Sequence, residues 1–459
     1  MTFIQFSILL VSLVISIIFY FKHAYSYWKK KRIPYLEPSF PHGNLDCLLP
    51  RGVSIGMQSK KFYDELKKRN LKYGGVYAIA QPMLVVNDID IIKDMFIKDF
   101  NHFMDRGLYH NESADTLSSN LFTQDGQKWK TLRTKFTPAF TSGKIKSMFD
   151  GVSLCAKNML DFLKNHEDKN EVNIKHLSQG FTIDVIGNTV FGITCNCFQS
   201  PDTMFRKMAK RVFEVDFLLA INMCLAIYYP GLAKKLGVRM SNKDVSDFFH
   251  KIVKDNMSYR ESNSITRPDF FQSLIDLKNL DNKDDGISIE EVVSQSFMFF
   301  VAGFETSSTT IMFCLYELAK NQEIQERVRK EIKKVMKQNN EEITSDGIKD
   351  MKYLEQVLDE TLRMYPPNVT LTRKCTKNYK IKNTEDITEE GTIVLVPVFG
   401  IHRDSDIWDN PEEFNPERFN ENNKKHIHPF AHLPFGGGPR NCIGMYFIIW
   451  VILQKLGNF

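Results

Sequence analysis

The chain has few cysteines, and no pattern links them. Eight cysteines are scattered through 459 residues, and none forms a Cys-x-x-Cys pair. This excludes a disulfide framework and a zinc ribbon, and a reducing compartment is expected.

The chain also lacks a large excess of charge of either sign. Sixty Lys and Arg against 55 Asp and Glu leave a formal net charge of only +5. A binder that neutralises nucleic-acid phosphates is therefore excluded, and no nucleic-acid partner is expected. Hydrophobic residues make up 43% of the chain, which is enough to bury a large core.

Only one uncharged apolar stretch reaches the length of a membrane span. It lies at the N-terminus, where residues 1–21 carry no charged side chain. It is long for a signal peptide, and the cationic cluster 29–32 follows it. We predict a transmembrane anchor at 1–22. By the positive-inside rule, the rest of the chain faces the cytosol.

The remaining chain is predicted to be mainly α with minor β. Residues 23–43 are basic and proline-rich and are expected to form a stiff linker. Residues 44–459 lack repeats and internal linkers, so they are interpreted as one domain. Apolar runs at 75–86 and 391–398 are typical of strands, and helical periodicity dominates elsewhere.

A long buried helix is expected to begin with a capping box formed by Ser288 and Glu291. It should continue to about Ala319 and cross the interior, because it is apolar on nearly every side. Gly303 weakens this helix, and Thr306 can bond back to the Ala302 carbonyl. The result is either a small polar groove that holds a ligand or a simple helix kink.

Two further patterns differ in how specific they are. Glu360 and Arg363 lie three apart on a predicted helix, and taken alone they are most simply a solvated surface pair. The stretch 434–444 is stronger, because glycines and prolines shape a tight loop from which Cys442 emerges at a helix start. That position, with Arg440 nearby, favours a thiolate, which is either a nucleophile or a metal ligand.

Two rival motifs fail. Residues 402–404 are similar to a kinase catalytic loop, but no Asp-Phe-Gly follows and no phosphate loop precedes them. His426, His428 and His432 could bind zinc only if a loop gathered them, and scattered solvent-facing histidines are the simpler interpretation.

Taken together, the motifs resemble those of the cytochrome P450 family, the haem-thiolate monooxygenases. The spacing of Phe435, Gly438, Arg440, Cys442 and Gly444 resembles the cysteine loop of that family. Three other segments resemble its oxygen-binding groove, its E-x-x-R pair and its PERF element, namely 302–306, 360–363 and 416–419. The stretch 129–146 is most similar to the animal microsomal detoxification branch, including insect members.

The resemblance implies a cytochrome P450 fold and assigns roles to individual residues. Cys442 would be the iron ligand of haem b (iron protoporphyrin IX), and Thr306 with Glu305 would deliver protons to bound O2. Arg418 would join Glu360 and Arg363 in a buried network. The expected propionate contacts are Trp129, Arg133, Arg373 and Arg106. Two residues of the cysteine loop, Arg440 and Phe435, are also expected to bind the cofactor.

The resemblance also implies a reaction and partners. One oxygen atom from O2 would enter an apolar substrate, either a xenobiotic or a lipid-like molecule. The electrons would come from NADPH through NADPH-cytochrome P450 reductase, with cytochrome b5 as a possible second donor. The substrate pocket would be roofed and lined by apolar side chains, which are Phe213, Phe217, Leu218, Ile221, Met223, Tyr228, Tyr229, Phe300, Phe304 and residues 369–371.

One departure from the family pattern keeps two alternatives open. The chain stops at Phe459, in the helix after Cys442, whereas family members continue for several dozen residues, so the C-terminal end is interpreted as truncated. The alternatives are a truncated non-catalytic remnant and a haem-thiolate isomerase that acts on peroxides without a reductase.

Overall fold

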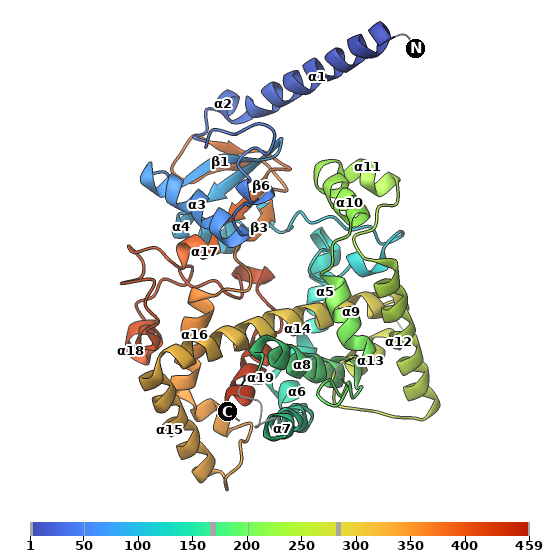
Figure 1. Ribbon diagram of the computed structural model, residues 1–459, viewed down its shortest axis with the longest axis vertical. Helices are drawn as coiled ribbons and strands as arrows, with labels where there is room; N and C mark the ends of the chain where they lie inside the picture. Colours follow the sequence, from blue (N-terminus) through green and yellow to red (C-terminus); the bar gives the residue numbers. More distant parts are fainter. Residues whose placement is uncertain (1–2, 50, 166–170, 201, 281–285, 458–459) are drawn as a thin grey trace. The chain divides into compact units, whose positions relative to one another are not determined.

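The computed structural model describes residues 3–49, 51–165, 171–200, 202–280 and 286–457. The described chain is mainly helical with two small sheets, as predicted (Figure 1). It divides into two compact units. Unit 1 comprises 1–107, 368–413 and 427–441, and unit 2 comprises 108–367, 414–426 and 442–459. The predicted truncation falls at Phe459, which lies outside the described residues.

Unit 1 is built around a four-stranded sheet with the order β1-β2-β6-β3. β1 and β2 form an antiparallel hairpin in which Tyr73 pairs with Val86, β6 runs parallel to β2, and β3 closes the edge antiparallel to β6. These strands confirm both predicted β segments. The strand bounds are β1 (Tyr73–Ala78), β2 (Gln81–Val86), β3 (Leu371–Lys374), β4 (Tyr379–Lys380), β5 (Ile387–Thr388) and β6 (Ile393–Val396).

Helices of very different lengths complete unit 1. They are α1 (Phe3–Tyr25), α2 (Tyr27–Lys31), α3 (Ile55–Lys68), α4 (Ile89–Lys93) and α17 (Val398–Ile401). α3 and α17 pack against each other, and the buried Tyr63 hydroxyl of α3 donates to the Asp404 carboxylate just after α17. This contact fixes the end of α17 within the unit.

The stretch expected as a linker, 23–43, lies on the sheet of unit 1. Trp28 is 1% exposed, and its indole Nε1 donates to the Val76 carbonyl at 3.1 Å. Further along, the Leu36 amide donates to the Gly75 carbonyl at 2.9 Å. The proline-rich stretch therefore uses its free backbone groups to bond to β1.

α1 fits a membrane anchor. α1 and α2 form a 29-residue stretch, Phe3–Lys31, with a mean hydropathy of 2.4 over its most apolar window, and none of that window is buried. A second helix, α14 (Ile289–Lys320), passes the same test of length and composition, but 44% of its window is buried inside the protein. α14 is thus a core helix, and α1 has an apolar surface that lipid can cover.

Unit 2 is almost entirely helical. Its helices are α5 (Gly126–Phe136), α6 (Ser142–Lys146), α7 (Phe149–Lys164), α8 (Ile174–Ile186), α9 (Met204–Val212), α10 (Phe217–Tyr228), α11 (Pro230–Lys235), α12 (Lys243–Ser262), α13 (Phe270–Lys278), α14 (Ile289–Lys320), α15 (Gln322–Gln338), α16 (Lys352–Met364), α18 (Glu421–Lys424) and α19 (Met445–Gly457). In Figure 1, α14 runs as one long helix with α8 beside it.

The capping box predicted for α14 is present. The Ser288 hydroxyl accepts from the Glu291 amide at 3.1 Å, and the Glu291 carboxylate accepts from the Ser288 amide at 2.9 Å. These bonds satisfy amides that have no partner inside the helix, which fixes its first turn. The helix then runs unbroken to Lys320, so the weak point at Gly303 does not interrupt it.

The apolar helix α10 is largely exposed. Phe217 is 82% exposed, Leu218 67% and Ile221 47%. In the following helix α11, Leu232 is 48% exposed. The segment expected to roof a pocket therefore also presents a broad apolar surface, and an exposed patch of this kind marks a binding or lipid-facing surface.

Lys455 on α19 is an unusual buried cation. The side chain is fully buried, its Nζ lies 3.2 Å from the Ser178 hydroxyl, and the same atom lies 5.1 Å from the centre of the Phe181 ring. Burial lowers the pKa of Lys455 from its ordinary 10.5 to about 7. Desolvation of the ammonium is the cause, because water solvates the charged form far better than the interior does.

We predict that Lys455→Met stabilises the protein most below pH 7. Between pH 7 and 10.5 the unfolded chain binds a proton that the folded chain does not, so wild-type stability rises with pH by at most about 1.4 kcal/mol per unit. The advantage of Lys455→Met should therefore shrink as the pH rises from 7 to 9. Urea unfolding at several pH values measures this trend. Lys157→Met, an exposed position on α7, serves as the control and should show no such trend.

Candidate functional site

The predicted groove on α14 has the expected local hydrogen bond. The Thr306 hydroxyl donates to the Ala302 carbonyl at 2.6 Å. Gly303 faces α8, and a side-chain carbon at that position would collide with Ile186. Gly303 therefore leaves room for the Ile186 side chain of α8, which a larger residue at this position would push aside.

Glu305 and an apolar surface lie next to Thr306. Glu305 is half-buried, and its carboxylate accepts from the Gln179 amide of α8 at a long 3.5 Å. Phe300 and Phe304 are buried and stack one turn apart, with ring centres 5.9 Å apart. α14 thus presents an acid and a hydroxyl beside aromatic rings, and the Gln179 contact is one that the sequence analysis missed.

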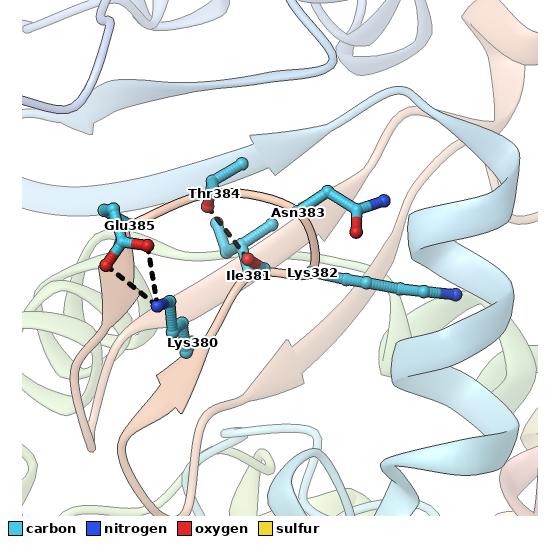
Figure 2. A pocket seen from close by; sticks show the side chains of 6 residues that line it. All are labelled: Lys380, Ile381, Lys382, Asn383, Thr384 and Glu385. Atoms are coloured by element: carbon cyan, nitrogen blue, oxygen red, sulfur yellow. Dashed lines mark hydrogen bonds and ion pairs between the residues drawn. The ribbon is translucent and has the colours of Figure 1, made fainter.

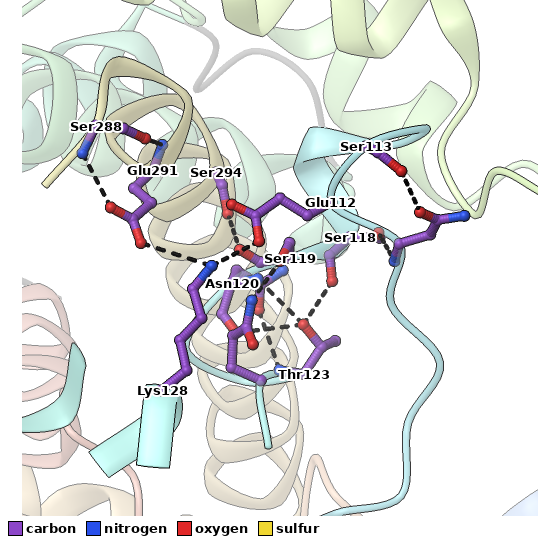
Figure 3. A network of polar contacts seen from close by, with 12 residues as sticks. Glu112, Ser113, Ser118, Ser119, Asn120, Thr123, Lys128, Ser288, Glu291 and Ser294 are labelled. Carbon is purple, nitrogen blue, oxygen red and sulfur yellow. Dashed lines mark hydrogen bonds and ion pairs between the residues drawn. The ribbon is translucent and has the colours of Figure 1, made fainter. Parts of the chain in front are cut away.

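A polar network holds the segment that precedes α5 against the N-terminal half of α14 (Figure 3). The Ser294 hydroxyl donates to the Ser119 carbonyl at 2.6 Å, and the Gln295 side chain accepts from the Leu121 amide at 2.9 Å. Figure 3 also shows the Lys128 ammonium between Glu112 and Glu291, at 2.5 and 3.9 Å. This segment is therefore fixed beside the helix that carries Thr306.

Trp129 and Arg133 lie on one face of α5, as their spacing of four predicts. Trp129 is 3% exposed, and Arg133 is half-buried. Burial lowers the pKa of Arg133, and negative charge on the Cys442 sulfur acts in the opposite direction. Arg133 and Cys442 are thus close enough in unit 2 to interact, so Arg133 can stabilise a thiolate or another anion beside it.

Arg106, Arg373 and Arg440 form a second cluster, in unit 1. Arg106 Nη2 donates to the Arg440 carbonyl at 2.9 Å, and Arg440 Nε donates to the Met104 carbonyl at 2.8 Å. Arg373 is 2% exposed and stacks over the Phe96 ring at 4.1 Å. An Asp105 oxygen lies 3.9 Å from Arg440 Nη2.

Arg373 provides a direct test of whether this cluster suits an acidic cofactor. Its pKa is lowered well below the ordinary value, first by burial and then by repulsion from Arg106 and Arg440. Its Nε is buried and has no hydrogen-bond partner among the residues that the structure describes. Buried polar groups almost always have partners, and a guanidinium pairs best with a carboxylate. The propionates of haem b fit this need.

The loop before Cys442 is held closely within unit 1. Gly438 has a φ of +68°, and its α-carbon approaches the Phe96 backbone so closely that no side chain would fit there. Gly436 has a φ of +73°, and Phe435 is half-buried. Both glycines therefore serve the tight turn that was predicted from the sequence.

The surface interpretation of Glu360 and Arg363 is wrong. Both side chains of α16 are fully buried, with Arg363 Nε 2.7 Å from a Glu360 oxygen. Arg418, in the short helix η8 (Pro416–Phe419), adds its Nε at 3.3 Å, and the Asn415 amide donates to the same carboxylate at 2.9 Å. The network expected from the family resemblance is present, because the packing of α16 against η8 excludes water from the pair.

A surface pocket lies apart from these residues, at the turn between β4 and β5 (Figure 2). It is lined by Lys380, Ile381, Lys382, Asn383, Thr384 and Glu385. Figure 2 shows Lys380 bonded to Glu385, and Lys382 pairs with Asp94 at 2.9 Å. Its cations are neutralised, and it contains none of the predicted site residues.

These features define a mainly helical protein equipped to bind an acidic cofactor. The cytochrome P450 family model matches residues 42–454. The chain is 39% identical to "Probable cytochrome P450 6a20" of Drosophila melanogaster over 447 residues, which is 96% of this chain and 89% of that protein. It is 39% identical to "Cytochrome P450 6A1" of Musca domestica, covering 97% and 89% of the two chains, and 36% identical to "Cytochrome P450 6k1" of Blattella germanica, covering 96% and 87%.

The chain therefore belongs to the cytochrome P450 family and is a haem monooxygenase of the insect-like branch. The family binds haem b and uses O2, a substrate and a redox partner such as a reductase. The predicted family, fold class and cofactor are confirmed.

Proposed function

We propose that Cys442 is the iron ligand and that the chain oxygenates apolar substrates with electrons from NADPH. The observation that carries this proposal is the tight turn that leads to Cys442, in which Gly436 and Gly438 have φ values of +73° and +68°, and the charge of Arg133 in unit 2 favours the thiolate of Cys442. A neighbouring cation stabilises the thiolate form that binds iron. Haem held through a thiolate supplies the oxygen-activating chemistry, which electron donation by sulfur favours.

Two groups of side chains would hold the propionates. Trp129 and Arg133 offer an indole N–H and a guanidinium from one face of α5. Arg106, Arg373 and Arg440 offer a cluster of guanidinium groups in unit 1, with Phe435 in the same loop as Arg440. Bidentate bonds from arginine to carboxylate make these residues suited to orienting a planar, acidic cofactor.

Thr306 and Glu305 would handle protons at the oxygen-binding groove. The Thr306 hydroxyl already bonds to the helix backbone and can shift that bond to a water molecule or to a ligand. The half-buried Glu305, whose carboxylate accepts from the Gln179 amide, can itself take up and release protons. The surrounding aromatic rings exclude bulk water from the groove.

The exposed surfaces suggest the substrate class and the location. α1 and α10 both expose apolar side chains, so a substrate that partitions into lipid would meet this protein at a membrane surface. We infer a single anchor in the endoplasmic reticulum membrane with the body in the cytosol, because the basic cluster follows α1. NADPH-cytochrome P450 reductase and cytochrome b5 are the inferred electron donors.

The test is the spectrum of the reduced carbon-monoxide complex of the full chain in membranes. Wild type and Cys224→Ala should show the red-shifted Soret band of thiolate ligation, since Cys224 is an exposed thiol on α10. Cys442→Ala should lose that band. A Cys442→Ala protein with an unchanged band would refute the assignment, and a wild-type chain that binds no haem would point to the non-catalytic remnant.

We predict that Thr306→Val uncouples electron consumption from product formation. Loss of the hydroxyl should slow product formation by about 100-fold, the lower end of what general acid–base catalysis contributes, while NADPH oxidation continues. Product and NADPH are measured together, and the carbon-monoxide spectrum should not change. The control is Thr310→Val, whose hydroxyl donates to the Thr306 carbonyl one turn away.

Peroxide turnover separates the rival enzyme class from this proposal. An isomerase would convert peroxides without NADPH or reductase, and Thr306→Val should leave that activity unchanged. If the chain shows only this behaviour, the electron source proposed above is wrong.

A further inference from the structure

The loop that leads to Cys442 has few backbone bonds of its own. Between Leu433 and Asn441, the only regular element in the described chain is the three-residue helix η9 (Gly438–Arg440). The Gly436 amide donates to the Leu433 carbonyl at 3.1 Å, and the Asn441 amide donates to the Gly438 carbonyl at 3.0 Å. Side chains elsewhere in unit 1 must therefore hold the rest of the loop.

The entrance of the loop is held by His402. The Leu433 amide is buried, and it donates to His402 Nε2 at 2.8 Å. The next residue is Pro434, which has no N–H, so the adjacent position cannot supply a backbone donor in place of this amide. An imidazole that accepts at Nε2 carries its proton on Nδ1 and is neutral.

His402 is itself fixed by its surroundings. It is fully buried at the end of α17, and its backbone amide donates to the Val398 carbonyl at 2.9 Å. Its ring lies 5.4 Å from the ring of His432. Trp408 donates its indole N–H to the Ile401 carbonyl at 3.2 Å and packs edge-on against His432. The acceptor therefore has little freedom to follow the loop if the loop moves.

The exit of the loop is held by different contacts. Arg106 donates to the Arg440 carbonyl, and Arg440 donates to the Met104 carbonyl, in both cases at under 3 Å. Between the two ends, Gly438 fits against the Phe96 backbone with no room for a side chain. Hydrogen bonds from outside the loop thus hold it at Leu433 and at Arg440, and close packing holds it at Gly438, so all three points define the path of the chain toward Cys442.

We propose that His402 is a positioning residue that fixes the cysteine loop through the Leu433 amide and so sets the orientation of the Cys442 sulfur. This inference rests on the proposed role of Cys442. His402 is a positioning residue because it acts on Cys442 through the buried hydrogen bond from the Leu433 amide.

The experiment compares His402→Phe with His402→Gln in the full haem-loaded chain. Phenylalanine keeps a planar ring without an acceptor, whereas glutamine places an amide oxygen near the position of Nε2. In His402→Phe, the fraction of haem with the thiolate band should fall at least threefold, and hydrogen exchange at the Leu433 amide should quicken about tenfold, the loss expected for one hydrogen bond. His402→Gln should restore most of both.

Each outcome decides the inference. If His402→Phe keeps the wild-type band and exchange rate, or if both variants lose them equally together with their folded structure, His402 only fills space and the inference is wrong. If wild type itself shows no thiolate band, the proposed function fails, and the Leu433 exchange rate still decides whether His402 anchors the loop.

Discussion

Replacing Glu360 by glutamine should lower the free energy of unfolding by about 3–5 kcal/mol. The carboxylate is fully buried and accepts from Arg363, Arg418 and the Asn415 amide. Glutamine removes the negative charge that pairs with the buried Arg363, and both side chains lie where water does not reach them. Urea unfolding of the haem-free chain measures the loss separately from any effect on the cofactor.

Two further variants test whether the loss of stability comes from breaking a buried ion pair. Glu355→Gln makes the same chemical change on the same helix, in an exposed pair with Lys352 at 3.8 Å, and should cost less than about 1 kcal/mol. The double variant Glu360→Met with Arg363→Met should be more stable than Glu360→Met alone. The reason is that the double variant no longer has a buried cation at position 363. A loss below 1 kcal/mol for Glu360→Gln would mean that the network contributes little to stability.

The sequence predicted those features whose signals are local. The capping box of α14 depends on two residues three apart, and the turn before Cys442 depends on glycines within a few positions of each other. The Thr306 bond to Ala302 spans a single helical turn. In each case the hydrogen-bonding partner is set by chain geometry, so residue type and spacing are sufficient.

Burial of a charged pair could not be predicted in this way. The spacing of Glu360 and Arg363 is the same in a surface pair and in a buried one, and only the packing of α16 against η8 distinguishes them. The bond from Leu433 to His402 joins residues 31 apart, and no local pattern marks it. Lys455 was missed for the same reason, since its burial follows from packing against α8.

Replacing Arg373 by methionine should have opposite effects on the haem-free and haem-bound protein. In the haem-free protein, Arg373 is a buried cation beside Arg106 and Arg440, and its Nε has no hydrogen-bond partner in the described part of the chain. Its removal should leave stability unchanged or raise it by about 1–3 kcal/mol, the cost of a buried unsatisfied group. In the haem-bound protein the same change removes a charged hydrogen bond to a propionate, so haem should be lost about 10- to 100-fold faster.

The effects of Arg373→Met on the stability of the haem-free chain and on haem retention distinguish an arginine that binds the cofactor from one that only supports the fold. Unfolding of the haem-free chain gives the first quantity, and transfer of haem to an excess of an acceptor globin gives the second. Arg373→Lys keeps the positive charge but loses the planar guanidinium that can make two parallel hydrogen bonds. It should therefore weaken haem retention without raising the stability of the haem-free chain. Arg69→Met, at an exposed arginine of the same unit, should change neither quantity. If Arg373→Met instead destabilises the haem-free chain and leaves haem retention intact, the cluster serves the fold of unit 1, and the propionates must be held by other residues.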